Sequence, residues 1–220
     1  MAQVEMQRAL LEAALPHVMF DGWTEATIRA AARDLDLDPE AAMNLFPAGP
    51  RDLVEAFSLW ADAQMLAGLA SLDLEEMRVR DRIASGIRLR LECLEPHREA
   101  VRKSLSFLGL PPNAPLATRL LWRTADELWY ACGDRATDYN YYSKRLLLSG
   151  VISATTLYWL DDRSEGASDT NAFLERRIDE VLTVGMRVGK TMSSILDLPD
   201  RLFRRPSLLD KRPRRRMGLR

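Results

Sequence analysis

Apolar residues recur at the spacing of an α-helix along almost the whole chain, and this periodicity limits the fold more than any other feature of the sequence. Glycine, proline and aspartate separate the periodic segments, as they do at helix ends. No segment alternates apolar and polar residues in the manner of a β-strand. The sequence therefore predicts an all-α protein of about ten helices, which we expect over residues 3–20, 24–35, 39–45, 51–70, 77–93, 97–108, 115–132, 138–161, 169–187 and 189–204.

The composition is that of a globular protein with one sizeable core, because 47% of the 220 residues are hydrophobic and 29% are charged. No apolar run reaches the roughly 20 residues of a membrane-spanning helix. The N-terminus has neither a signal peptide nor an Arg/Ser-rich presequence, so we expect a protein that is neither exported nor imported. Cys93 and Cys132 lie far apart without histidine at ligand spacing, which favours a reducing cytoplasm over a disulfide framework or a metal site.

Charge is distributed unevenly. Residues 201–220 contain nine basic side chains and one acidic one, whereas the first 200 residues have a formal charge of −9. An acidic body with a basic tail predicts that the tail binds anionic lipid or nucleic acid.

The first 50 residues have a distinctive order of helices and turns. A helix ends at Asp21-Gly22-Trp23, a turn follows at 36–39, and the next short helix ends at Phe46-Pro47, before Asp52-Leu53. This arrangement resembles the DNA-binding head of TetR-type regulators. Between residues 21 and 50, however, two basic residues face six acidic ones, and the helix in the recognition position contains no basic residue. Phosphate contacts supply most DNA affinity, so we expect a degenerate helix-turn-helix that binds no specific nucleic acid.

Residues 126–145 contain five aromatic side chains, although aromatic residues make up 7% of the chain. Gly133 is expected to end one helix, and Thr137 or Asp138 to cap the next. Tyr139 and Tyr142 share a helical face, and Tyr141 points elsewhere, so at least one ring is expected to face solvent. Such a surface is typical of protein recognition; alternatively, the rings are buried and only the hydroxyl groups reach water.

This segment, Asp-Glu-Leu-Trp-Tyr-Ala-Cys-Gly-Asp-Arg-Ala-Thr-Asp-Tyr-Asn-Tyr-Tyr-Ser-Lys-Arg, resembles the signature of the ubiquinone biosynthesis accessory family known as coenzyme Q biosynthesis protein nine. The resemblance covers roughly residues 5–190 and includes Thr155-Thr156 and 173–178. The sequence departs from the family at Leu128, Tyr141 and Cys132. The resemblance implies a TetR-like fold and a site for a demethoxyubiquinone hydroxylase-type enzyme. That partner-binding site would comprise Asp126, Leu128, Asp134, Asp138, Tyr141, Tyr142 and Arg145.

The resemblance also implies an apolar cavity within the helical bundle of residues 51–187, which would bind an isoprenoid quinone precursor or a phospholipid. The segment supplies many apolar side chains, most of which are expected to form ordinary core. We assign eight of them to the lipid site: Leu94, Leu105, Phe107, Leu121, Trp122, Leu148, Ile152 and Trp159.

The sequence contains no recognisable arrangement of catalytic residues. A di-iron bundle needs Glu-x-x-His pairs, but the residues three before His17 and His97 are Ala14 and Leu94. There is also no glycine-rich phosphate loop. We therefore predict a protein with no catalytic residues, no metal and no cofactor.

Residues 188–205 carry an apolar stripe beside basic residues, which is typical of a helix lying in a membrane interface. The family resemblance agrees, although the stripe is also compatible with packing on the bundle or with a dimer seam. Pro199 interrupts the segment and favours two short helices. The expected membrane-binding residues are Met192, Ile195, Leu196, Leu202 and Phe203.

Together these features predict a degenerate head (1–50), a lipid-binding bundle (51–187), an amphipathic membrane helix (188–205) and a disordered basic tail (206–220). The expected function is a non-catalytic accessory role in ubiquinone synthesis, in a homodimer on an anionic membrane surface. The location would be cytoplasmic, on the inner face of a bacterial plasma membrane, or the matrix side for a mature mitochondrial form. The alternatives are a ligand-responsive TetR-type repressor and a nucleic-acid binder that works through the basic tail.

Overall fold

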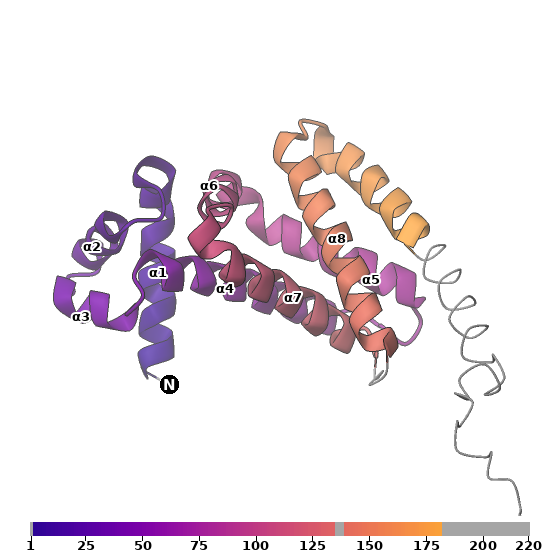
Figure 1. The fold of residues 1–220 in the computed structure, drawn as a ribbon, viewed down its shortest axis with the longest axis horizontal. Coiled ribbons are helices and arrows are strands. Elements are labelled where there is room, and N and C mark those ends of the chain that lie inside the picture. Colours follow the sequence, from indigo (N-terminus) through magenta and orange to yellow (C-terminus); the bar gives the residue numbers. More distant parts are fainter. Residues whose placement is uncertain (1, 135–138, 182–220) are drawn as a thin grey trace, which may run out of the picture. The chain divides into compact units, whose positions relative to one another are not determined.

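A computed structural model describes residues 2–134 and 139–181, without the side chains of Ala2, Tyr139 and Asn140 (Figure 1). Helical backbone also covers 168–181. Three short 3-10 helices lie at Glu95–His97, Pro111–Asn113 and Glu165–Ala167. The α-helices are α1 (Ala2–Asp21), α2 (Glu25–Asp34), α3 (Pro39–Leu45), α4 (Pro50–Ala70), α5 (Val79–Leu94), α6 (Arg98–Leu108), α7 (Ala114–Ala131) and α8 (Tyr139–Asp161).

The predicted all-α class is confirmed, since the described ranges contain helices and no strand. Eight labelled helices and the 168–181 segment are slightly fewer than the ten expected. Every predicted helix up to residue 161 has a counterpart whose ends differ by two residues or fewer. The predicted helix at 188–205 with its membrane-binding residues, the tail at 206–220 and Asp138 all lie outside the described residues. Among the helices described, none is both long and apolar enough to cross a bilayer.

Helices α1, α2 and α3 form the head, and short polar caps set the turns between them. Thr24 caps α2, where its hydroxyl accepts a hydrogen bond from the Thr27 amide at 3.3 Å. Asp38 caps α3 in the same way, accepting from the Ala41 amide at 3.0 Å, and Pro39 occupies the first turn. Helices α1 and α3 are joined by Gln7, whose amide donates to the Leu45 carbonyl at 2.8 Å. The helix-turn-helix expected from the sequence is therefore present as a structure.

Helix α4 runs from the head into the bundle, where it packs on α5 and α7. Trp23 and Phe57 join the two parts, with ring centroids 5.3 Å apart, and the Trp23 indole donates to the Ala100 carbonyl at 3.3 Å. Helices α7 and α8 pack on each other, and α8 continues through a short turn into 168–181 (Figure 1). One hydrophobic core contains residues from Leu10 to Ile178, so the described residues form a single compact unit.

Candidate functional site

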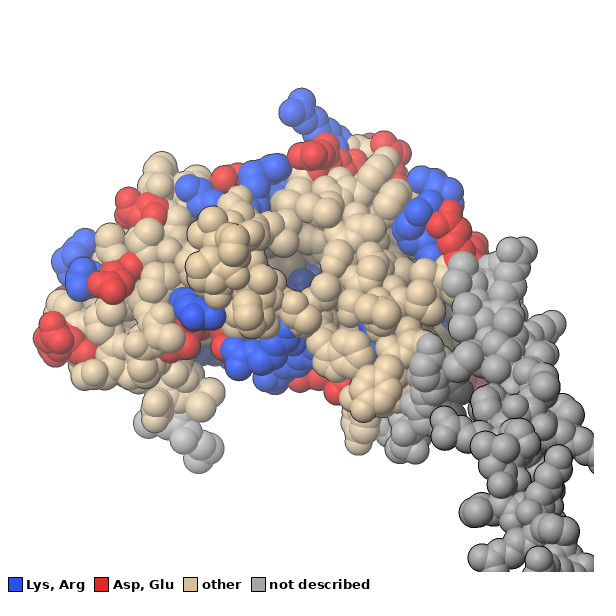
Figure 2. Space-filling view, viewed as in Figure 1, with Lys and Arg blue, Asp and Glu red and all other residues tan. Residues whose placement is uncertain are grey.

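An apolar cavity of about 350 Å³ lies inside the bundle, between helices α4, α5, α6, α7 and α8. Figure 2 shows the surface hollowed at this place among uncharged residues, with basic atoms visible at its depth. Its volume is at the lower end of the roughly 300–1,000 Å³ of small-molecule sites. The lining consists of Val54, Phe57, Ser58, Ala61, Arg90, Leu94, Val101, Ser104, Leu105, Leu108, Gly109, Ala117, Leu120, Leu121, Thr124, Ile152, Ser153, Thr156 and Leu157.

Four of the eight residues assigned to the lipid site line this cavity, and they come from four different helices. Small residues such as Ala61 and Ala117 also line the cavity, and they were not assigned to it. A small side chain leaves room for a ligand but gives no apolar signal of its own. The four residues are Leu94, Leu105, Leu121 and Ile152.

The other four assigned residues do not line this cavity. Leu148 is buried in the hydrophobic core, and Phe107 is partly buried and packs against the outside of that core. Trp159 is buried near a second, polar cavity, where its indole donates to Glu95 at 2.9 Å and its ring lies 4.6 Å from the Arg98 guanidinium. Trp122 lies next to Leu121 in sequence but points to a different side of α7, toward two tyrosines.

The wall of the apolar cavity also contains Arg90, which belongs to a charged pair that was not predicted from the sequence. Asp62 of α4 is 1% exposed, and one of its oxygens accepts from Arg90 Nε at 2.8 Å. The Thr124 hydroxyl lies 3.0 Å from both carboxylate oxygens. A lone acid in the apolar run Leu59-Trp60-Ala61-Asp62-Ala63 is the signal that could have identified it, because a buried carboxylate requires partners.

At the junction of α7 and α8, Gly133 ends the first helix as predicted, with a φ of 95° that favours glycine. Beyond it, Arg145 is 2% exposed and donates to Asp126, and it reaches Asp134 at 3.1 Å. Lys144 also donates to Asp134, at 2.6 Å, and the Tyr141 hydroxyl donates to Asp126 at 3.0 Å. We call these five residues the Arg145 network.

The Arg145 network stabilises the charged forms of Asp134 and Arg145. Burial alone would raise the pKa of Asp134, but the hydrogen bonds from Lys144 and Arg145 outweigh it and lower that pKa below its ordinary value. Burial likewise opposes the charge of Arg145, yet its bonds to Asp126 and Asp134 raise its pKa. The network therefore clamps the start of α8 to the end of α7.

Beside this network, Trp122, Tyr141 and Tyr142 form an aromatic cluster. The centroid distances are 6.5 Å from Trp122 to Tyr141, 6.2 Å from Trp122 to Tyr142 and 5.1 Å between the tyrosines. Tyr142 is 63% exposed, which confirms that at least one ring faces solvent. Tyr141 is half-buried and stacks under the Arg145 guanidinium at 3.5 Å.

Of the seven partner-binding residues inferred from the family resemblance, Asp138 lies outside the described residues and Asp134 is bound by Lys144 and Arg145. The other five fall into two groups. Tyr142, Tyr141 and Asp126 reach the surface at the aromatic cluster. Leu128 is fully buried against α5, and Arg145 lies beneath the surface, so neither offers a contact to a partner. Their role in this structure is to shape the surface that carries Tyr142.

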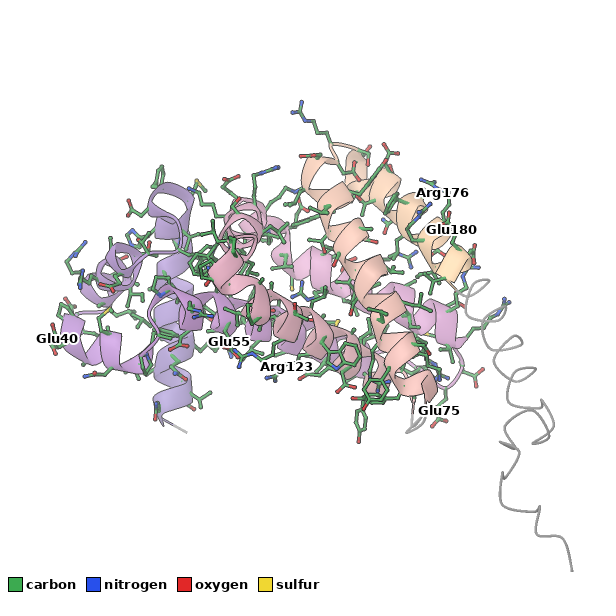
Figure 3. The ribbon with its side chains drawn as sticks, in the orientation of Figure 1. Glu40, Glu55, Glu75, Arg123, Arg176 and Glu180 are labelled. Atoms are coloured by element: carbon green, nitrogen blue, oxygen red, sulfur yellow. The ribbon has the colours of Figure 1, made fainter. Side chains whose placement is uncertain are left out.

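The charged residues provide no metal centre among those described, where no group of three or more His, Cys, Asp or Glu has the geometry to hold an ion. In the head, His17 pairs with Asp34 at 2.6 Å, and Arg29 pairs with Glu25 at 3.0 Å. Figure 3 shows Glu40 projecting from the outer end of α3, the helix in the recognition position.

A family model described as COQ9 matches residues 114–185, the stretch that contains α7, the aromatic cluster and α8. The chain is 32% identical over 195 residues to the ubiquinone biosynthesis protein COQ9, mitochondrial, of Drosophila melanogaster, covering 86% of this chain and 60% of that protein. It is 30% identical over 200 residues to the Homo sapiens protein of the same name, covering 88% and 63%. For COQ9-B of Xenopus laevis, the identity is 30% over 204 residues, covering 88% and 68%.

The chain spans less than two thirds of the length of the Drosophila and human proteins. Among solved structures, the TetR transcriptional regulator from Nitrosomonas europaea ATCC 19718 superposes with a TM-score of 0.65 at 21% identity. That match covers 81% of this chain and 98% of the regulator. At this identity the likeness concerns the fold alone, and it confirms the predicted TetR-like architecture.

Proposed function

Because the chain belongs to the COQ9 family, we propose that it is a non-catalytic accessory protein of ubiquinone biosynthesis, which binds a polyprenylated quinone precursor and presents it to a hydroxylase. The observation that carries the proposal is the apolar cavity, which five helices enclose. A concave, mostly apolar site with a few polar groups is the form that small-molecule sites usually take.

The proposal assigns no chemistry to the protein itself. Burial raises the pKa of Cys93 and of Cys132 to about 11, so both thiols stay protonated at neutral pH and lack the thiolate that nucleophilic catalysis needs. The two histidines are also engaged: His17 pairs with Asp34, and His97 lies edge-on against the Trp60 ring at 5.5 Å.

The aromatic cluster is the surface that we assign to the hydroxylase. Aromatic residues beside charged ones dominate the energetics of protein interfaces, and Tyr142 offers an exposed ring on a backbone that the Arg145 network holds. The expected homodimer and the membrane contact of 188–205 stay predictions. Sedimentation of the full chain tests the first, since a monomeric mass would contradict it.

The repressor alternative rests on the fold. Its head would have to bring exposed acids, such as Glu25 and Glu40, against DNA phosphates, which opposes binding. A salt-dependent mobility shift with an operator duplex would favour this alternative over the accessory role.

The accessory role is tested by reconstitution. Liposomes containing a demethoxyubiquinone are mixed with the hydroxylase, and product is measured with and without this protein. We expect addition of the protein to raise the rate, and a chain cut after residue 187 to lose most of that gain because the membrane segment is removed. An unchanged rate with the full chain would contradict the proposed presentation.

A further inference from the structure

Asp62 and Arg90 form a charged pair beside the apolar cavity, and the hydrogen bonds of this pair do not use all the donors of Arg90. Asp62 accepts hydrogen bonds from Arg90 Nε at 2.8 Å and from the Thr124 hydroxyl at 3.0 Å, so its acceptor capacity is largely used within the protein. Thr124 in turn comes from α7, which fixes the carboxylate between three helices. An ion pair this deep costs desolvation energy, and that cost is retained here beside a mostly apolar cavity.

Arg90 has donors left over. A guanidinium carries five N–H groups in a rigid planar fork. Nε is bound to Asp62, and Nη2 approaches the Ser58 hydroxyl at 3.5 Å. Within the described part of the chain, Nη1 has no hydrogen-bond acceptor, although Arg90 lines the cavity. Two oriented N–H groups are therefore available to a ligand.

Charge balance selects the chemistry of that ligand. The pair of Arg90 and Asp62 is neutral as a whole, so a phosphate placed there would bring an uncompensated negative charge close to the Asp62 carboxylate. A neutral oxygen acceptor, such as a quinone carbonyl or a ring hydroxyl, satisfies the Nη1 donors without adding charge. The wall therefore favours a neutral oxygen-bearing ring over a phospholipid headgroup.

The rim of the cavity is apolar. Leu105 of α6 and Leu157 of α8 both line it, and they are 36% and 59% exposed, whereas Asp62 is buried. At about 350 Å³ the cavity takes a ring with the first part of a chain, but not a long polyprenyl tail. The remainder of such a tail has a hydrophobic path outward over these two leucines.

We propose that the cavity receives a prenylated quinone or phenol ring first, with a ring oxygen on Arg90 Nη1 and the tail leaving between Leu105 and Leu157. Asp62 acts as a positioning residue, which orients the guanidinium. This inference rests on the proposed function, because it specifies which part of the precursor the protein encloses.

The test compares affinities of the full chain for three probes: a ubiquinone with a short isoprenoid tail, the hydrocarbon of that tail, and phosphatidylglycerol. The variant removes both charges together, Asp62→Leu with Arg90→Met, because removing Arg90 alone would leave a buried unpaired carboxylate. We expect it to bind the ubiquinone about tenfold or more weakly, as for loss of a hydrogen bond to a charged group, and to bind the hydrocarbon unchanged.

A second variant, Arg90→Lys, keeps the positive charge opposite Asp62 but loses the planar fork, so it should also weaken ubiquinone binding. Equal ubiquinone affinity in the wild type and a folded variant would overturn the head-inward orientation and leave the lipid-binding function standing. Preference of the wild type for phosphatidylglycerol would also overturn it. Failure of the wild type to bind any of the three probes would overturn the inference and the proposed function together.

Discussion

Two buried arginines differ in how much of their hydrogen-bonding capacity the protein uses. Arg145 donates to two carboxylates and to the Tyr141 carbonyl, and its guanidinium stacks on the Tyr141 ring, so its contacts lie within the fold. Arg90 pairs with a single carboxylate, lines the cavity, and has no acceptor for Nη1 among the described residues. Arg145 therefore holds α7 and α8 together, whereas Arg90 has the unused hydrogen-bond donors expected of a ligand-binding residue.

Tyr142 is the residue on which recognition of the hydroxylase is expected to depend most. Its ring is 63% exposed, and the Arg145 network holds the backbone that carries it. Truncation of the side chain therefore removes contact area with little effect on folding. Tyr142→Ala should weaken the complex about tenfold or more, as measured by titration with the purified hydroxylase. Tyr142→Phe keeps the ring and should bind nearly as well. Unaltered binding by the alanine variant would remove the aromatic cluster from the interface.

Asp162 is expected to make stability depend on pH. Burial alone would raise its pKa, but hydrogen bonds from Ser164 and Thr170, 2.5 to 2.8 Å long, outweigh burial and hold the pKa far below its ordinary value. Because the folded pKa is depressed, this stabilisation is complete above the unfolded pKa of about 4 and is lost as the pH falls further.

The contribution of the Asp162 carboxylate to stability can be measured by replacing it. Asp162→Ala should lower the free energy of unfolding by about 1 to 2 kcal/mol near neutral pH, as for loss of a helix cap. In urea titrations the difference from wild type should shrink below about pH 4. A difference that stays constant with pH would mean that the carboxylate's charge contributes nothing.

At the scale of helices, α5 and α7 approach each other so closely that a glycine is needed between them. A Cβ at Gly86 would lie 2.4 Å from a Leu128 methyl group and 3.2 Å from one of Leu69. Leu128 is completely buried, so its side chain can move only by displacing core neighbours. This contact explains why Leu128 serves the core instead of the partner surface.

Gly86→Ala should therefore lower the free energy of unfolding by about 1 to 3 kcal/mol through overpacking, despite alanine's better helix propensity. Gly150 in α8 is the matched control, since a Cβ there meets nothing within 4 Å. Gly150→Ala should raise the free energy of unfolding by roughly 1 kcal/mol. Equal effects of the two substitutions in urea titrations would contradict the close approach of α5 and α7.

The helices themselves could be predicted from sequence, but the cavity only in part. Periodicity and caps depend on neighbouring residues, which is why Gly133 identified the end of α7 and the turn at 36–39 identified the start of α3. Which apolar residue faces a cavity depends on how five helices pack. Leu121 and Trp122 are adjacent and both apolar, yet Leu121 lines the cavity and Trp122 joins the aromatic cluster.

For the whole molecule, a TetR-like fold is combined with an acidic head, an internal cavity and an exposed aromatic cluster. The cavity lies between helices that all belong to the bundle, and α8 contributes both to its wall and to the aromatic cluster. One helix thus connects the proposed lipid site with the proposed partner site. This arrangement is consistent with an accessory protein that holds a lipid beside the enzyme that uses it.

The central claim, that this cavity is the lipid site, is tested most directly by mass spectrometry of lipid extracted from the purified protein. Wild type is compared with Ala117→Phe, which fills the cavity, and Thr118→Phe, which places the same ring on the exposed side of α7. We expect an isoprenoid quinone or prenylphenol with wild type and with Thr118→Phe, and its loss from Ala117→Phe. The same lipid content in all three proteins, or only bulk phospholipid in wild type, would contradict the account.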